Sequence, residues 1–394
     1  MDHPTSPMVI VGFFELDRPV DLTALRAVAA ERLLRHRRFR QAVDERPGRR
    51  PRWVDAHVDL NHHVREVEAD GSDLAAHADR LSSTPIDRSR PLWEILVVTG
   101  DHPSILVRLH HSIADGIALL AVLMSVCDAA DGDEATLPSP RDLGGSYLRR
   151  ILGLLSGVVR LTLLRADPST SLRVPLSGTK RTAWSPTISV ESLKQAGRTT
   201  GATINDLLVA GVSGAVRELL SVRGERPDRD IRAMVPFNLR PPTDGTSLGN
   251  RFGMVLPQLP ITTEGVADRL VAATAAMDRI KRTFQAEAAF AIVQVMGTSA
   301  AIVEAAIVRF FGPKSSLVLT NVAGPTGRLR LAGVDVTRLM FWVPQAGGIG
   351  LGVSLMSYDG GVTLGVTSDA AVLAEPGHLV DAWVREMGLL MGPA

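Results

Sequence analysis

The chain is poor in cysteine: Cys127 is the only one among 394 residues. A single cysteine excludes an internal disulfide, and because Cys127 lies in an apolar run we predict a buried structural thiol rather than a nucleophile. Long apolar stretches are also missing, since none approaches the roughly 20 residues that a transmembrane helix needs. Residues 1–7 are too short and too polar for a signal peptide. We therefore expect a cytoplasmic protein.

The chain also has no large excess of basic or acidic residues. The 43 basic and 42 acidic residues give a net charge of +1 with histidine neutral, so we do not expect nucleic acid to be a main partner. The sequence also lacks a glycine-rich phosphate loop with its lysine and a metal-ligand cluster beyond one histidine pair. These absences favour a mechanism without a resident metal or cofactor.

The length of the chain predicts more than one core, because single cores stop growing well below this size. Pro, Ser and Gly concentrate in residues 167–180, as in an inter-domain connector. We predict an N-terminal domain over residues 1–140, a crossover helix and linker over 141–180, and a C-terminal domain over 181–394.

The centre of the sequence is the segment 104–123, where a strand pattern changes to a helix pattern around H-H-S-I-A-D-G. A neutral His111 at the end of that strand is suited to take a proton from an attacking hydroxyl or amine. Gly116 opens the helix, whose backbone N–H groups are suited to meet an oxyanion, and Asp115 is suited to hold the loop by pairing with an arginine. A structural role is equally open for His110, which strand alternation turns away from His111.

Two stretches carry a resemblance to known enzymes. H-H-S-I-A-D-G, residues 110–116, resembles the H-H-x-x-x-D-G signature of the coenzyme A-dependent acyltransferase superfamily, which includes chloramphenicol acetyltransferases and peptide-synthetase condensation domains. P-I-D-R-S-R-P-L-W-E, residues 85–94, is similar to the P-L-D-R-S-R-P-L-W-E block of the bacterial wax ester synthase/diacylglycerol acyltransferase family. From the residues alone, Trp93 in this block is expected in the core, and the strand that it begins is expected to pair antiparallel with the strand that ends at the histidine pair.

Two local signals lie elsewhere in the chain. Asp21 is a predicted N-cap for a helix over residues 22–34. Asp359-Gly360-Gly361 predicts a hairpin turn between two strands.

Other blocks follow in the order of that family. T-I-N-D-L-L-V-A resembles its second block, in which the pair matched by Asn205 and Asp206 is implicated in activity or in shaping the site. The residues alone are explained by helix capping from Thr203 or Asn205. G-N-R-F-G places Asn250 in a region that approaches the site in the family, although a plain tight loop explains it too.

Two further matches are partial. T-N-V-A-G-P, ending at Pro325, resembles the family's S-N-x-P-G-P block, with Thr320 and Ala323 as departures. Phe39-Arg40 resembles a Leu-Arg pair of the superfamily, which makes Arg40 the predicted partner of Asp115. The family's L-S-x-x-D-x-x-F segment has no match before the first strand, which leaves the acyl-chain specificity open.

The resemblance covers residues 8–390 and implies a fold and an activity. The implied fold is α/β (α+β), with two chloramphenicol-acetyltransferase-like domains, each a mixed, largely antiparallel sheet with helices, and a tunnel between them. The implied activity is transfer of a fatty acyl group from acyl-CoA, a co-substrate, to a long-chain alcohol or diacylglycerol. His111 would act as general base without an acyl-enzyme, His110 would support the site, and donors near Gly116 and Asn250 would meet the oxyanion.

Two alternatives stay open. One is an acyltransferase of secondary metabolism that uses another hydroxyl or an amine as acceptor, or a carrier protein as donor. The other is a non-catalytic lipid- or membrane-binding homologue. Residues 146–165 form an apolar helix pattern with arginines at both ends, which fits either peripheral contact with the inner membrane face or lipid droplets, or a crossover helix between domains.

Overall fold

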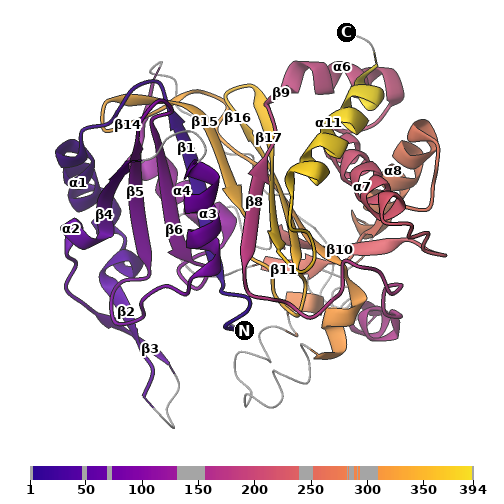
Figure 1. Ribbon diagram of the computed structural model, residues 1–394, viewed down its shortest axis with the longest axis horizontal. Coiled ribbons are helices and arrows are strands. Elements are labelled where there is room, and N and C mark those ends of the chain that lie inside the picture. The colour runs from indigo at the N-terminus through magenta and orange to yellow at the C-terminus, as the bar shows by residue number, and fades with distance from the viewer. Residues whose placement is uncertain are drawn as a thin grey trace, which may run out of the picture.

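The protein consists of two large sheets that stand side by side, each covered by helices (Figure 1). The structure, a computed structural model, describes residues 3–46, 51–68, 73–130, 156–238, 252–281, 283, 288–290, 292 and 309–392. Among these residues one sheet has seven strands and the other has eight. The predicted α/β architecture of two mixed sheets with helices is confirmed.

The first sheet has the strand order β4-β5-β6-β1-β15-β14-β7. Its strands β5 and β6 pair antiparallel, as the sequence predicted for the strand that ends at the histidine pair. Helices α1 and α4 pack on one face of this sheet and α3 packs on the other. The elements are β1 (Val9–Leu16), β4 (Val64–Glu68), β5 (Trp93–Thr99), β6 (Ser104–His110), β7 (Asp128–Ala129), β14 (Leu329–Leu331), β15 (Val334–Trp342), α1 (Leu22–Glu31), α3 (Asp73–Ser83) and α4 (Gly116–Val126).

Strands from the end of the chain complete this first sheet. β1 pairs antiparallel with β6 along one edge and with β15 along the other, so that Val11 lies opposite both Arg108 and Trp342. β15 and β14 belong to the segment 181–394, which the sequence assigned to the second domain. The two sheets therefore do not coincide with the two halves of the sequence.

The second sheet has the order β11-β10-β13-β16-β17-β8, with β12 beside β10 and β9 beside β17. Helices α6, α7, α8 and α11 bury their apolar sides against one face of it. The predicted turn between β16 and β17 is confirmed, because Asp359 and Gly360 both have positive φ, at 44° and 75°. The elements are β8 (Lys180–Trp184), β9 (Ile188–Ser189), β10 (Ile231–Asn238), β11 (Phe252–Val255), β12 (Gln258–Leu259), β13 (Leu317–Ala323), β16 (Leu351–Tyr358), β17 (Gly361–Asp369), α6 (Val190–Thr200), α7 (Ile204–Val222), α8 (Val266–Lys281) and α11 (Gly377–Met391).

A second histidine pair lies in one of the smaller elements and has structural contacts. His62 and His63 end the short helix α2 (Leu60–His63), and His63 is buried with its ring stacked on Trp93 at a centroid separation of 4.5 Å. Its Nδ1 lies 2.7 Å from the carbonyl oxygen of Trp93, and Trp93 itself is buried, as predicted. The other small elements are β2 (Gln41–Asp44), β3 (Arg52–Asp55), η1 (Leu33–Arg35), η2 (Arg37–Arg40) and η3 (Gly312–Lys314).

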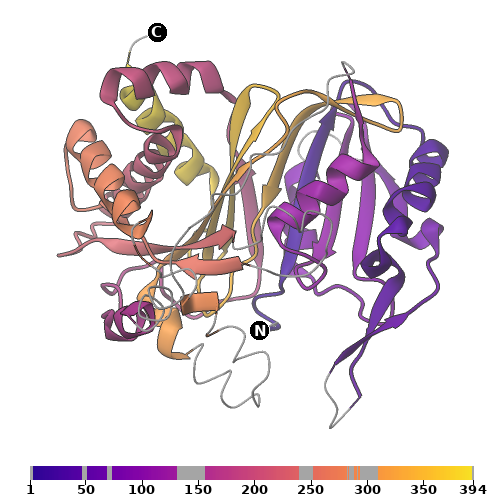
Figure 2. The same cartoon turned by 180° about the vertical axis from the view of Figure 1, so that it is seen from behind.

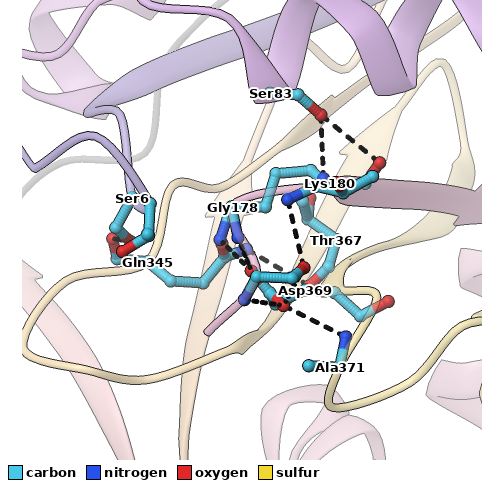
Figure 3. A network of polar contacts seen from close by, with 12 residues as sticks. Ser6, Ser83, Gly178, Lys180, Gln345, Thr367, Asp369 and Ala371 are labelled. Carbon is cyan, nitrogen blue, oxygen red and sulfur yellow. Dashed lines mark hydrogen bonds and ion pairs between the residues drawn. The ribbon is translucent and has the colours of Figure 1, made fainter. Parts of the chain in front are cut away.

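A buried ion pair holds the connector that leads into the second sheet (Figure 3). Nζ of Lys180, the first residue of β8, lies 3.3 Å from a carboxylate oxygen of Asp369 at the end of β17, and both side chains are almost fully buried. Asp369 also accepts hydrogen bonds from the backbone N–H groups of Ser177, Gly178 and Ala371. The connector is thus fixed to the edge of the second sheet that β17 and β8 form.

The predicted helix over residues 146–165 is described only in part. Residues 156–163 are helical, and residues 146–155 lie outside the described residues. In the described part of the chain, no helix combines the length and the apolar character that crossing a membrane requires.

Candidate active site

The two histidines at the end of β6 point in different directions. The ring of His110 is buried in its own half of the molecule, with Nδ1 2.7 Å from Oγ of Ser112. The ring of His111 is half-buried and lies 5.7 Å, between centroids, from Phe252 on β11 of the second sheet. The backbone N–H of His111 donates to the carbonyl oxygen of Met8 at 2.8 Å. His111 therefore faces the other sheet from a fixed backbone position.

The loop after the histidines is closed by a helix cap. The carboxylate of Asp115 is buried and accepts a 3.0 Å hydrogen bond from the backbone N–H of Ala118 in the first turn of α4. The sequence explains this, because Asp is a preferred N-cap residue and Gly116 can begin the helix. The remaining N–H groups of this turn have no acceptor within the helix. They form a set of donors within a few residues of His111.

The structure does not bring Arg40 to Asp115. Arg40 ends η2 with an exposed side chain, whereas Asp115 is buried beneath α4. No ion pair among the described residues joins the two. In its place Oδ1 of Asp115 caps its own helix, by accepting from the backbone N–H of Ala118.

The end of β13 links the first turns of two helices from different halves of the molecule. Asn321 donates from Nδ2 to Oδ1 of Asn205, on the first turn of α7, at 3.0 Å. The next residue, Val322, lies beside the first turn of α4, since a Cβ atom placed on Gly116 would be 4.0 Å from it. Asn205 thus reaches the strand end that also contacts the H-H-x-x-x-D-G loop.

Asp206 has a structural partner in its own helix. Thr203 is the N-cap of α7 and forms a capping box with Asp206, whose Oδ2 accepts from the Thr203 N–H at 3.0 Å and from its hydroxyl at 2.6 Å. Of the two predicted caps it is therefore Thr203 that acts, which leaves Asn205 to bind Asn321. The other oxygen of Asp206 is buried and has no hydrogen-bond partner among the described residues.

Two residues of the site were not singled out from the sequence, Phe252 and Asn321. Both lie in blocks that were noticed: Phe252 follows the predicted Asn250 by two positions, and Asn321 is a polar residue near the end of a buried strand. A polar residue at that position was the feature of the sequence that could have indicated Asn321 as a site residue. Asn250 lies outside the described residues.

Neither metal binding nor a reactive thiol is indicated near these groups. The described residues contain no group of three or more His, Cys, Asp or Glu side chains placed to share a metal ion. Cys127 follows α4 and is buried, as predicted, and burial raises its pKa to about 12. The thiol is therefore un-ionised at neutral pH and is not suited to act as a nucleophile.

Comparison with known protein families shows to which family the chain belongs. Residues 1–161 match the wax ester synthase/diacylglycerol acyltransferase catalytic domain, and residues 248–391 match the WS/DGAT C-terminal domain. The chain belongs to the wax ester synthase/diacylglycerol acyltransferase family. It is therefore an acyltransferase, and the first of the two matches contains the whole H-H-S-I-A-D-G loop.

Individual members of the WS/DGAT family are distant from this chain in sequence. A protein of Mycobacterium tuberculosis named a probable diacylglycerol O-acyltransferase, Tgs1, is 27% identical over 397 residues, which cover 91% of this chain and 86% of the relative. A second from the same organism, Tgs2, is 29% identical over 317 residues, covering 70% of this chain and 69% of the relative.

Solved structures show the same fold. The wax ester synthase/diacylglycerol acyltransferase of Marinobacter aquaeolei VT8 superposes with a TM-score of 0.73 at 21% identity, covering 99% of this chain and 95% of that one. The first condensation domain of the calcium-dependent antibiotic synthetase superposes with a TM-score of 0.64 at 17% identity, covering 98% and 91%. The architecture of the WS/DGAT family is thus shared with condensation domains.

Proposed function

We propose that this enzyme transfers a fatty acyl group from coenzyme A to the hydroxyl group of a long-chain alcohol or a diacylglycerol, with His111 as general base. The observation that carries the proposal is the position of the His111 ring, which directly follows β6 of one sheet and faces Phe252 of the other. Relatives named diacylglycerol O-acyltransferases support this choice of acceptor. Acyl-CoA enters as a co-substrate, and no resident cofactor is invoked.

In the proposed reaction a ring nitrogen of His111 takes the proton of the acceptor hydroxyl as its oxygen attacks the thioester carbonyl. The tetrahedral intermediate then collapses, the C–S bond breaks, and the proton on His111 passes to the departing thiolate of coenzyme A. The products are the ester and free coenzyme A, and the histidine regains its initial state. No acyl-enzyme forms, because the acceptor attacks the thioester directly.

The surrounding residues would stabilise and orient this reaction. The first-turn N–H groups of α4 that Asp115 does not use are suited to receive the oxyanion. Ser112, 2.7 Å from His110, would hold the first histidine and with it the conformation of the loop. Asn205 and Asp206 would shape the opposite side of the site from α7, and Asn250 would contribute a further donor.

We also propose where the enzyme works. Long-chain alcohols and diacylglycerols partition into lipid, so an enzyme that uses them as acceptors must meet them at a lipid surface. We therefore propose a cytoplasmic protein in peripheral contact with the inner membrane face or with lipid droplets.

The test is an assay with palmitoyl-CoA and either hexadecanol or a diacylglycerol, following thiol release and the ester by mass spectrometry. We expect acceptor-dependent ester from the wild type and a loss of about 10²- to 10⁴-fold in His111→Ala, the usual contribution of a general base. The matched control is His102→Ala, because His102 is exposed and lies beyond the opposite end of β6. A wild type that makes no ester with either acceptor would contradict the lipid acceptors and favour another hydroxyl or amine.

A further inference from the structure

An exposed apolar surface lies where the helix of residues 156–163 meets residues 309–314. Val159 and Leu163, one helical turn apart on the same face, are 54% and 77% exposed, and Phe310 is 48% exposed. Large apolar side chains at such exposure leave water when a partner covers them. We call Val159, Leu163 and Phe310, with the arginines named below, the apolar-basic surface.

The two segments form one surface because Lys314 joins them. Its buried Nζ donates to the carbonyl oxygens of Leu161 and Thr162, both at 2.8 Å, at the end of the helix. The same Nζ lies 3.9 Å from the centroid of the Phe310 ring. The helix and the orange segment that follows residue 308 lie beside each other in both views (Figures 1 and 2).

The charged side chains of this surface are all positive. Arg160, Arg165 and Arg309 are exposed around the apolar side chains, and residues 156–165 and 309–314 contain no Asp or Glu. Apolar side chains ringed by arginines are suited to the boundary of an anionic bilayer, where the former enter the acyl region and the latter meet phosphate groups. A second copy of the chain fits less well, because a two-fold contact would set these arginines against one another.

The surface is also connected to the active site. Leu161, on the buried side of the helix, and Phe311 belong to the same apolar cluster as Met254 on β11. Met254 and Phe252 lie on the same face of β11, about 7 Å apart along the strand. Because Phe252 faces His111, one short strand links the surface to the histidine.

We propose that the apolar-basic surface docks the enzyme on an anionic phospholipid membrane and so presents lipid acceptors to the site beside His111. The docking proposal is supported by the properties of the surface alone, whereas the proposed delivery of an acceptor rests on the proposed function. Both can be measured separately on the full-length chain.

The experiment measures co-sedimentation with phosphatidylcholine vesicles that contain or lack phosphatidylglycerol. We expect tighter binding when phosphatidylglycerol is present, a loss of at least about tenfold in Leu163→Asp, and a loss of about fivefold or more in Arg160→Glu. Leu389→Asp is the matched control, because Leu389 is 66% exposed on α11 and lies outside the surface. Leu163 is so exposed that its variant should keep the thermal midpoint of the wild type.

Three results would overturn the docking proposal: no vesicle binding by the wild type, equal losses in Leu163→Asp and Leu389→Asp, or a wild-type dimer that Leu163→Asp dissociates without any vesicle binding. The last result would assign the surface to a second copy.

The delivery of an acceptor is tested by enzyme activity. Leu163→Asp should lose ester formation from diacylglycerol in vesicles but keep it with the soluble acceptor octanol. A wild type inactive with both would refute the proposed function and leave the binding result intact.

Discussion

Nδ2 of Asn321 donates a hydrogen bond of 3.0 Å to Oδ1 of Asn205, which ties the end of β13 to the first turn of α7. The following residue, Val322, lies beside Gly116 at the start of α4, so we expect the bond to hold one wall of the candidate site. We expect Asn205→Ala and Asn321→Ala each to lower kcat/KM about three- to tenfold, the usual value of one hydrogen bond. The double variant should be no worse than either single one. Additive losses would show that the two side chains act separately, and Asn61→Ala on α2 serves as control.

The cap of α4 predicts a difference between two substitutions of Asp115. Asp115→Ala should lower the free energy of unfolding by about 1 to 2 kcal/mol, because the Ala118 N–H loses its acceptor. Asp115→Asn should stay close to the wild type, since an amide oxygen caps equally well. Urea unfolding measures both. Equal destabilisation by Asn and Ala would show that the negative charge, rather than the cap, is what the fold requires.

The buried pair of Lys180 and Asp369 predicts an unequal cost of removing its two members. Asp369→Ala leaves a buried ammonium group without its carboxylate and frees the donors of the connector, so we expect a loss of about 3 to 5 kcal/mol in stability. Lys180→Met should cost less, because Asp369 keeps its hydrogen bonds from Ser177, Gly178 and Ala371. Chemical unfolding with matched m-values tests the order. A larger loss in Lys180→Met would contradict it.

His63 predicts a dependence of stability on pH. Burial lowers its pKa below the ordinary value of 6.5, so the unfolded chain binds the proton more tightly than the folded one. This contribution to stability is complete above pH 6.5 and is lost as the pH falls below 6.5 toward the folded pKa. His63→Phe, which keeps a ring against Trp93, should reduce the slope of unfolding free energy against pH in that window. An unchanged slope would refute the assignment, and His102→Phe is the exposed control.

The single cysteine provides a probe of unfolding. Because burial raises the pKa of Cys127 to about 12, the native thiol is almost entirely un-ionised at pH 8 and is covered by the core. We expect its reaction with a disulfide reagent to be at least about a hundredfold slower in the native protein than in urea. Its rate should follow the unfolded fraction through a denaturation curve. Rapid reaction of native protein would mean that the segment after α4 opens locally.

The sequence predicted features whose cause is local. Asp21 caps α1 by accepting from Thr23 at 2.9 Å, Asp359 and Gly360 make the turn between β16 and β17, and Trp93 is buried. In each case the chemistry of a few neighbouring residues decides the outcome: a side-chain acceptor at a helix start, positive φ in a short turn, or a large apolar ring beside a strand.

The sequence did not predict which distant segments pair. The alternation in Val334–Trp342 marks a strand, but it carries no information on whether that strand joins the first sheet or the second. The bond between Asn205 and Asn321 joins residues 116 positions apart, so neither residue's neighbours indicate it. Arg40 was paired with Asp115 by resemblance, whereas in the structure a backbone N–H of α4 donates to the Asp115 carboxylate.

The insertion of β15 beside β1 has a consequence for synthesis. The partner of β1 on one edge, β6, is complete once residue 110 has been made, but its partner on the other edge, β15, is complete only when residue 342 has been made. At about 5 to 20 residues per second, the interval between residues 110 and 342 lasts roughly 10 to 50 seconds. Throughout that interval the nascent chain carries an open apolar strand edge, which is a template for aggregation. We expect nascent chains of this protein to depend on chaperones more than a chain whose sheets close in sequence order.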